Sequence, residues 1–332
     1  MITRAIITGT GHCVPDRVVT NNDLAKIMDT SDEWIQQRSG IRERRHIEDG
    51  LAPSDLGAKA ALNALEAAKL TSKDIDLLLV TTLSSEHTFP GTAAFIQRKL
   101  GMQGIPAMDL RAQCSGFLYG LATADAFIKS GSYGRVLLVS AEVHSRALDF
   151  SDRGRDTAVL FGDGAGAVIL EPSPNPERGI MSIKLHSDGD FAEKLWVEYP
   201  SMAQTPHVTP EIVREGGVYP KMDGKFVFKH AVTRLPEVVS EVLESLHLKP
   251  QDIDHWLFHQ ANLRINEHVA ATLGVSVEKC PYNIDRYGNC SSASIPILLD
   301  EQVRAGNIKP WKLIGCAAFG SGFTWGGAVI RW

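Results

Sequence analysis

The strongest constraint on the fold of this chain is an internal repeat that spans most of its length. Residues 70–80 (LTSKDIDLLLV) correspond to residues 248–258 (LKPQDIDHWLF), and residues 128–131 (IKSG) correspond to residues 303–306 (VRAG). Phe161-Gly-Asp-Gly has its counterpart in Phe319-Gly-Ser-Gly, and Ala-Val-Ile follows in both copies. Matches in the same order, at an offset of about 175 residues, indicate a duplicated half and not a solenoid of short repeats.

Each half alternates apolar strands with helices, which predicts an α/β fold with a mainly parallel, helix-covered sheet in each half. Residues 76–82 and 135–141 are apolar runs, as expected for strands that are covered on both faces. We place the N-terminal half at residues 1–174 and the C-terminal half at residues 175–332, joined near a turn-rich stretch at 171–176.

Several local signals refine this picture. Residues 2–8 are predicted to form a strand, and Gly9-Thr10-Gly11 is interpreted as the turn that closes it, since a third glycine of a dinucleotide-binding motif is missing. Residues 54–69 form an Ala-rich amphipathic pattern that predicts a helix. Thr20 and Thr30 are predicted N-caps of two short helices at 20–28 and 30–38.

Composition narrows the class of function. The 332 residues carry a formal net charge of −5, which argues against a nucleic-acid partner. No run reaches transmembrane length and no signal peptide is recognisable, so we expect no membrane association and a cytoplasmic location. The five cysteines form no C-x-x-C pair, which favours a reduced enzyme without a structural metal.

One cysteine stands out as a candidate nucleophile. Cys114 lies between a strand-like segment, 107–110, and a small-residue helical run, 115–130. A sulfur at a helix N-terminus is expected to be favoured as the thiolate, which is the reactive form. Taken alone, however, a cysteine in such a segment is more often a buried packing residue.

The repeat brings two further residues to Cys114. At an offset of 175 residues Cys114 corresponds to Asn289, which also precedes a small-residue helix, and His259 follows the apolar strand of the same half. Ends of parallel strands are where α/β folds place catalytic groups. We therefore predict that His259 and Asn289 donate hydrogen bonds to an oxyanion, with a second oxyanion hole from backbone N–H groups of Cys114 and the loop 319–322. Separately, His259 could be structural and Asn289 a turn residue.

The chain resembles the β-ketoacyl-acyl carrier protein synthase III family, the initiating condensing enzymes of bacterial fatty acid synthesis in the thiolase superfamily. The resemblance extends over nearly the whole chain. Its matching pieces are residues 29–35 (DTSDEWI), 38–44 (RSGIRER), the Cys114 segment, 152–154 (DRG), 161–166 (FGDGAG), 259–264 (HQANLR), Gly288-Asn289 and 319–326 (FGSGFTWG). It implies a five-layered α-β-α-β-α thiolase-like fold and a homodimer with a subunit-crossing loop at Thr88-Phe89-Pro90.

The resemblance also implies the chemistry. Cys114 would take an acyl group from an acyl-coenzyme A, and malonyl-acyl carrier protein would then enter the site. His259 and Asn289 would stabilise the enolate formed on loss of carbon dioxide, and its carbanion would attack the acyl-cysteine. Phe319 would lie beside the malonyl carboxylate, where an apolar ring favours neutral carbon dioxide. Coenzyme A enters this scheme as a substrate thioester, and no permanently bound cofactor is expected.

Binding residues follow from the same motifs. Trp34 and Arg38 would stack on adenine with Arg153 nearby, although on one short helix the two could simply pair with each other. Four residues, Thr30, Gly224, Phe228 and Asn262, would line the pantetheine tunnel. Gln260, Ala261, Asn262, Leu263 and Arg264 would form the docking segment for an acidic acyl carrier protein.

The sequence departs from the family pattern in places that concern the acyl donor. Gln113 and Ser115 flank the nucleophile where alanine is common, Arg45 looks inserted, and residues 199–221 look longer than usual. Ser321 replaces a glycine in the predicted oxyanion loop. Two alternatives therefore stay open: an acyltransferase that passes the acyl group to an oxygen or nitrogen nucleophile or uses a longer donor, and a non-catalytic subunit that only binds acyl chains.

Overall fold

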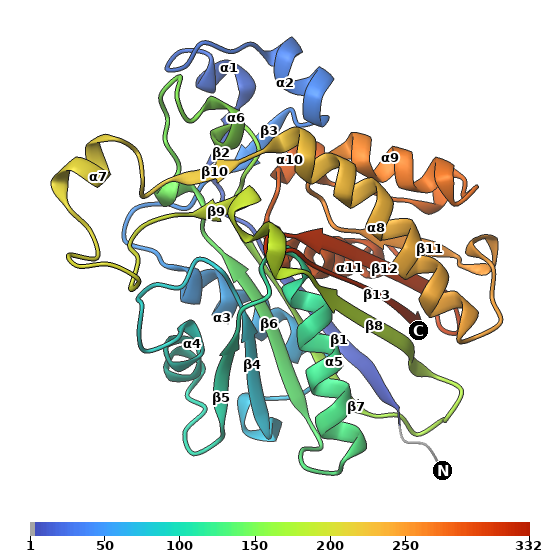
Figure 1. Ribbon diagram of the computed structural model, residues 1–332. Helices are drawn as coiled ribbons and strands as arrows, with labels where there is room; N and C mark the ends of the chain where they lie inside the picture. Colours follow the sequence, from blue (N-terminus) through green and yellow to red (C-terminus); the bar gives the residue numbers. More distant parts are fainter. Residues whose placement is uncertain (1–3) are drawn as a thin grey trace.

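The computed structural model describes residues 4–332 and contains two mixed β-sheets, one in each half of the chain (Figure 1). The first sheet has the strand order β1-β7-β6-β4-β5, and the second has the order β11-β12-β13-β8. The strands of the first are β1 (Ala5–Cys13), β4 (Leu77–Thr81), β5 (Ala107–Leu110), β6 (Val136–Glu142) and β7 (Gly164–Pro172). Those of the second are β8 (Gly179–Ser187), β11 (His255–Phe258), β12 (Leu313–Gly320) and β13 (Thr324–Arg331).

The prediction of mainly parallel sheets is wrong. In the first sheet β4 is parallel to β5 and β6, but β7 runs antiparallel to both β6 and β1. In the second sheet only the pair β11–β12 is parallel. In each half the last strand returns beside its neighbour without a full crossover helix, which permits antiparallel pairing.

Six long helices and the two sheets form five layers, α-β-α-β-α, as expected (Figure 1). One apolar cluster lies between the first sheet and its outer helices, a second lies between the second sheet and its outer helices, and a third fills the space between the sheets. The outer helices are α3 (Pro53–Ala68) and α4 (Thr92–Leu100) on one side and α8 (Gly224–Glu244) and α9 (Leu263–Thr272) on the other. The central layer contains α5 (Gly116–Lys129) and α11 (Ser294–Arg304).

Gly9 and Gly11 do not form the predicted turn, because β1 continues through them to Cys13. Both glycines allow β1 to pack closely against α3. A Cβ on Gly9 would lie 2.3 Å from the carbonyl oxygen of Ala64, and one on Gly11 would lie 2.3 Å from that of Ala60. A short distance between helix and strand, and not a chain reversal, explains this glycine pair.

Smaller elements cover the end of the sheets where the strands lead to the site. They are β2 (Val18–Thr20), α1 (Asn21–Leu24), α2 (Asp32–Ser39), β3 (Glu43–Arg45), α6 (Arg155–Ala158), β9 (Leu195–Val197), α7 (Pro210–Arg214), β10 (Pro220–Met222) and α10 (Ile284–Tyr287). Thr20 is the N-cap of α1, as predicted. Thr30 is not a cap, because the hydroxyl of Ser31 accepts the N–H of Trp34 at the start of α2.

The two central helices begin in the same way, and their first turns show which residues of the two halves correspond. A single 3-10 turn precedes each: η2 (Gln113–Ser115) leads into α5 and η7 (Ser291–Ala293) leads into α11. The first residue of each turn has a positive φ, +45° at Gln113 and +47° at Ser291. The counterpart of Cys114 is therefore Ser292, and the predicted equivalence with Asn289 is wrong by three residues.

Within residues 4–332, the structure has no helix that combines the length and the apolar character needed to cross a membrane.

Candidate active site

A cavity of about 610 Å³ contains the predicted catalytic side chains. Residues of both halves line it, and Cys114 lies among them with Asn289 and His259. The cavity also contacts most of the residues predicted to bind coenzyme A or a carrier protein. These are Trp34, Arg38, Gly224, Phe228, Ala261, Asn262 and Arg264, together with Phe319 of the predicted catalytic set. Sequence reasoning thus located one continuous site, assembled from segments far apart in the chain.

Cys114 is held by hydrogen bonds from the second half of the chain. Its side chain is 7% exposed and lies in the turn η2, directly before α5. The hydroxyl of Ser291 donates to Sγ at 3.5 Å, and the backbone N–H groups of Ser321 and Cys114 also donate to the sulfur. The two N–H groups that were predicted to form an oxyanion hole therefore both point at the nucleophile.

Burial makes the resting cysteine a thiol. Burial, with a smaller contribution from the nearby Glu142 and against the hydrogen bonds to Sγ, raises the pKa of Cys114 to about 11. The prediction that the helix N-terminus favours a thiolate is therefore wrong, since the desolvation of a buried anion outweighs the helix dipole. The thiol must lose its proton as it attacks.

His259 is arranged as a neutral hydrogen-bond donor. Its Nδ1 lies 2.7 Å from the hydroxyl of Ser294, which also accepts the backbone N–H of Gln260 at 3.2 Å. If that hydroxyl gives its own proton to Nδ1, all three groups are satisfied and the ring proton resides on Nε2. Nε2 is buried and has no partner among residues 4–332. Burial lowers the pKa of His259 to about 3, so the ring is uncharged at neutral pH.

Asn289 offers its amide N–H groups in the same way. Its Oδ1 accepts the backbone N–H of Ser291 at 2.8 Å, which identifies Nδ2 as the end that is left to donate. The backbone of Asn289 is fixed as well, because its N–H donates to Leu160 and its carbonyl accepts from Gly162. His259 Nε2–H and Asn289 Nδ2–H₂ are thus two oriented donors in one buried cavity.

The end of β12 shapes the floor of this cavity. Phe319 is buried, with its ring centroid 4.8 Å from that of Phe323, so it presents a rigid apolar surface. A Cβ on Gly320 would lie 2.6 Å from Cβ and 3.0 Å from Sγ of Cys114, so this position requires glycine. The side chain of Ser321 turns away and donates to the carbonyl of Leu195, which leaves its backbone N–H at the sulfur.

Trp34 and Arg38, which were predicted to stack on adenine, lie together, but the second arginine beside Trp34 is not the predicted one. The guanidinium of Arg38 lies 4.5 Å from the ring centroid of Trp34, so the two do pair with each other. Arg155 lies 4.8 Å from the same ring. The predicted neighbour, Arg153, is bound instead to Asp149 at 2.6 Å and to the carbonyl of Arg214 at 3.0 Å. Motif position alone did not distinguish the two arginines.

Of the four residues predicted to line the pantetheine tunnel, three contact the cavity and one does not. Gly224, Phe228 and Asn262 line the cavity, and the Nδ2 of Asn262 donates to the carbonyl of Arg38 at 2.9 Å. Thr30 lies outside the lining, with its hydroxyl buried.

Within the docking segment only Arg264 is exposed. Gln260 is 1% exposed and bonds to the carbonyl of Phe258 and the N–H of Asn283, so the prediction that it contacts a partner is wrong. Leu263 packs inward against Gly40.

Three neighbours of the predicted site residues were not themselves predicted from the sequence: Ser291, Ser294 and Arg155. Gly320 lies in the predicted oxyanion loop 319–322, but its close approach to Cys114 was not predicted. Ser291 and Ser294 follow Asn289 in the same short segment, but nothing in a run of small polar residues distinguishes a hydrogen-bonding serine from a packed one. For Gly320, the repeat of Phe-Gly-x-Gly was a signal that the backbone passes close to another group.

The duplicated five-layered fold, with a buried cysteine facing a histidine and an asparagine, defines an acyl-transferring enzyme of the thiolase fold. The family model for 3-oxoacyl-[acyl-carrier-protein] synthase III matches residues 108–189, and the model for the C-terminal part of that family matches residues 243–332. The chain belongs to the 3-oxoacyl-[acyl-carrier-protein] synthase III family.

Individual relatives agree over the full length. The chain is 47% identical to the β-ketoacyl-[acyl-carrier-protein] synthase III of Paramagnetospirillum magneticum, with 100% of both chains covered. It is 44% identical to that of Oceanobacillus iheyensis over 98% of both chains. The crystal structure of the Aquifex aeolicus synthase III superposes with a TM-score of 0.90 at 41% identity, covering 99% of this chain and 100% of that one.

Proposed function

We propose that this enzyme condenses an acyl-coenzyme A with malonyl-acyl carrier protein through an acyl group on Cys114, and so initiates fatty acid synthesis. One observation supports this proposal above others: a buried thiol shares its cavity with two uncharged, oriented hydrogen-bond donors, His259 and Asn289. A hydrolase would need a basic histidine beside the thiol, whereas burial lowers the pKa of this histidine to about 3.

In the first half-reaction the acyl group moves to the enzyme. Sγ of Cys114 attacks the thioester carbonyl, the bond from that carbon to the coenzyme A sulfur breaks, and coenzyme A leaves as a thiol with the proton that Cys114 gives up. The backbone N–H groups of Cys114 and Ser321, which point at Sγ, are placed to stabilise the negative oxygen that forms in this step.

In the second half-reaction the malonyl thioester loses carbon dioxide. The bond between its carboxylate and the neighbouring carbon breaks, and the electron pair forms an enolate whose oxygen accepts from His259 Nε2–H and Asn289 Nδ2–H₂. The carbanion attacks the acyl carbonyl on Cys114, the bond from that carbon to Sγ breaks, and the departing thiolate takes a proton from water. The buried ring of Phe319 disfavours the carboxylate and favours neutral carbon dioxide.

The rest of the cavity suits a long thioester substrate. We assign the nucleotide end of coenzyme A to Trp34 and Arg38 at the mouth and the pantetheine arm to Gly224, Phe228 and Asn262. Aromatic and guanidinium planes are suitable stacking surfaces for a purine. Coenzyme A is a substrate in this scheme, and the chemistry described uses no permanently bound cofactor.

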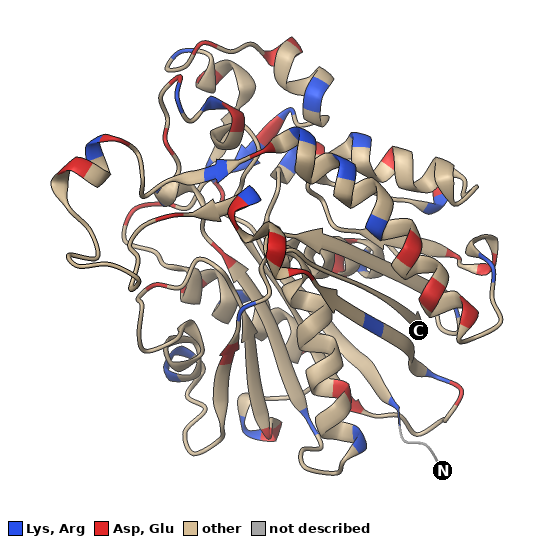
Figure 2. Cartoon of the chain, in the orientation of Figure 1, with Lys and Arg blue, Asp and Glu red and all other residues tan. Residues whose placement is uncertain are grey.

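A basic surface around the mouth suits an acidic carrier protein. Lys225 and Arg264 line the cavity, and Lys229 follows one helical turn after Lys225 on α8. Figure 2 shows that the basic residues of α8 lie in its N-terminal half and the acidic residues in its C-terminal half. A local patch of this kind attracts an acidic partner although the chain has a net charge of −5.

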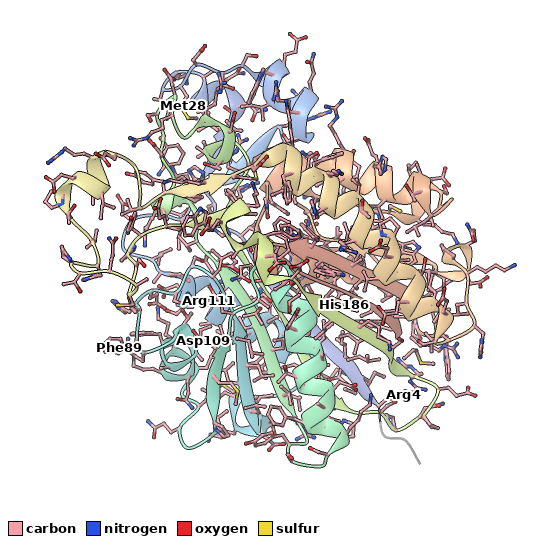
Figure 3. The ribbon with its side chains drawn as sticks, in the orientation of Figure 1. Arg4, Met28, Phe89, Asp109, Arg111 and His186 are labelled. Carbon is pink, nitrogen blue, oxygen red and sulfur yellow. The ribbon has the colours of Figure 1, made fainter. Side chains whose placement is uncertain are left out.

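We propose a homodimer, formed at the free edge of the first sheet. The edge strand β5 pairs on one side with β4 and, among the described residues, has no partner strand on the other. Phe89 is 84% exposed, and Figure 3 shows it on the same side of the molecule as Asp109 of β5. An unpaired strand and an exposed aromatic ring both indicate a surface that a second copy covers.

The five free cysteines support a cytoplasmic location.

Release of carbon dioxide decides between this function and a simple acyltransferase of the same fold. Acylated enzyme is given malonyl-acyl carrier protein, and carbon dioxide and 3-oxoacyl product are measured together. We expect equal amounts of both. Acyl transfer to an alcohol or amine without carbon dioxide would establish the acyltransferase, and failure of Cys114 to take any acyl group would establish a non-catalytic subunit.

A further inference from the structure

Glu142, at the end of β6, is a buried carboxylate that the reaction above does not use. It is 0% exposed. Its oxygens accept the hydroxyls of Ser292 at 2.5 Å, Ser84 at 2.7 Å and Thr82 at 3.2 Å, and the N–H of Leu83 at 3.2 Å. Burial raises the pKa of Glu142, while these hydrogen bonds lower it.

The directions of these hydrogen bonds identify the charge state. The hydroxyl oxygen of Ser84 accepts the N–H of Val143, and that of Thr82 accepts the N–H of Ser84, so both hydroxyl protons are directed at Glu142. Only the hydroxyl of Ser292 could take a carboxyl proton, because it has a second acceptor in the carbonyl of Thr81 at 3.3 Å. The other three donors, the hydroxyls of Thr82 and Ser84 and the N–H of Leu83, favour the anion.

The carboxylate joins three segments at the nucleophile. It ends β6, binds the residues that follow β4, and through Ser292 binds the turn η7. Ser292 is the counterpart of Cys114 in the second half, and the two turns face each other, since a Cβ on Gly116 would lie 3.1 Å from that of Ser292.

The turn that Glu142 anchors makes two contacts with the catalytic groups. The hydroxyl of Ser291 donates to Sγ of Cys114 at 3.5 Å, and its N–H donates to Oδ1 of Asn289 at 2.8 Å. A shift of this turn would therefore move the support of the nucleophile and of one oxyanion donor together.

We propose that Glu142 is a positioning residue of this site, which through Ser292 fixes the turn Ser291–Ala293 so that Ser291 holds both Cys114 and Asn289. Glu142 does not line the cavity and so acts without touching substrate. The inference rests on the proposed role of Cys114 as the nucleophile.

The charge of Glu142 gives this role a signature that packing alone lacks. The buried histidines His259 and His144 are neutral, because burial lowers their pKa values to about 3 and about 4. Arg38, Asp156, Lys225 and Arg264 also line the cavity, but the charge that most affects the pKa of Cys114 is that of Glu142. The anion of Glu142 faces the sulfur from β6 and raises the pKa of Cys114. Removing the anion should therefore make the thiolate more abundant.

The first test measures the rate at which iodoacetamide alkylates Cys114 as a function of pH, without any thioester present. Glu142→Gln should shift the profile to lower pH and raise the rate at pH 8 by about threefold or more, since each pKa unit changes the thiolate fraction by about tenfold. The matched control is Asp163→Asn, because Asp163 is equally buried and accepts four hydrogen bonds. A Glu142→Gln profile that superimposes on the wild type, or an equal shift in the control, would overturn the inference.

The second test separates the anchor from the charge, and it remains decisive if Glu142→Gln does not fold. Ser292→Ala removes the bond to the turn, while Ser84→Ala removes a bond to the same carboxylate from a different segment. We expect Ser292→Ala to slow malonyl decarboxylation about tenfold or more and Ser84→Ala to leave it near the wild-type rate. Equal effects of the two would contradict the positioning role. Absence of decarboxylation in the wild type would defeat the proposed function, and the alkylation profiles would still decide the role of Glu142.

Discussion

Gly320 gives the sharpest structural prediction, because it leaves no space for a side chain beside the nucleophile. In Gly320→Ala the new Cβ would lie 2.6 Å from Cβ, 3.0 Å from the backbone nitrogen and 3.0 Å from Sγ of Cys114. Carbon atoms pack best at about 3.5–4.0 Å, so Cys114 or the end of β12 must move by roughly 1 Å. Both belong to the proposed oxyanion hole, since Ser321 follows Gly320 directly.

A displacement of this size should affect catalysis far more than folding. A misplacement of about 1 Å costs about 100-fold in rate, whereas overpacking costs about 1–3 kcal/mol of stability. We therefore expect Gly320→Ala to acylate Cys114 about 100-fold more slowly while it still unfolds cooperatively. The assay follows the acyl adduct by intact mass in a quenched time course and the stability by thermal unfolding.

The control is Gly189→Ala, where the added Cβ has no neighbour within 4 Å. It should acylate at the wild-type rate. If Gly320→Ala acylates within about threefold of the wild type, the close approach of β12 to the nucleophile does not set the geometry of the oxyanion hole, and our account of that loop is refuted.

Three further predictions concern the other groups of the site. His259→Ala or Asn289→Ala should reduce malonyl decarboxylation by about 100-fold or more while acylation changes little; equal losses in both half-reactions would contradict their assignment to the enolate. Because burial lowers the pKa of His259 to about 3, the ring stays neutral and decarboxylation should show no inflection between pH 8 and pH 5, whereas a fall centred near pH 6.5 would show an ordinary, exposed histidine. Trp34→Ala and Arg155→Ala should raise the KM for acyl-coenzyme A but not for an acyl-pantetheine, which lacks the nucleotide. Arg153→Ala should raise this KM less, because the guanidinium of Arg153 is bound to Asp149. A larger effect of Arg153→Ala than of Arg155→Ala would instead support the arginine predicted from the motif.

Acidity should also weaken the fold. Burial lowers the pKa values of His46 and His144 to about 4 and of His259 to about 3, so only the unfolded chain takes up these protons as the pH falls below 6.5. Each histidine should lower the free energy of unfolding, measured with denaturant, by about 2 kcal/mol between neutral pH and pH 5. Equal free energies at pH 7.5 and pH 5 would contradict the burial of these rings.

The repeat predicted one helix-covered sheet in each half and the family resemblance predicted the five layers, but strand direction and register needed the structure. Apolar runs such as 76–82 show that a strand is buried, not which way its neighbour runs, and β7 proved antiparallel to both neighbours. Loop lengths differ between the halves, so one offset could not align every element: it paired Cys114 with Asn289, whereas the turns pair it with Ser292.

The meeting of the proposed catalytic residues in one cavity was predictable because chemistry restricts their residue types, while their environment was not. Cys114, His259 and Asn289 reach one cavity as expected. Their protonation depends on burial and on neighbours such as Glu142 and Ser294, which the sequence does not place. This is why the predicted thiolate is a thiol, and why the sequence did not show that Arg155 lies beside Trp34.

The most direct test of the account is the acyl adduct itself. The enzyme is incubated with an acyl-coenzyme A, digested and analysed by mass spectrometry before and after addition of malonyl-acyl carrier protein. We predict one acyl group, located on the peptide that contains Cys114, which disappears as carbon dioxide and 3-oxoacyl product form. An adduct on another residue would contradict the role of Cys114 as the acyl carrier. An adduct on Cys114 that malonyl-acyl carrier protein does not remove would contradict the role of His259 and Asn289 in forming the carbanion.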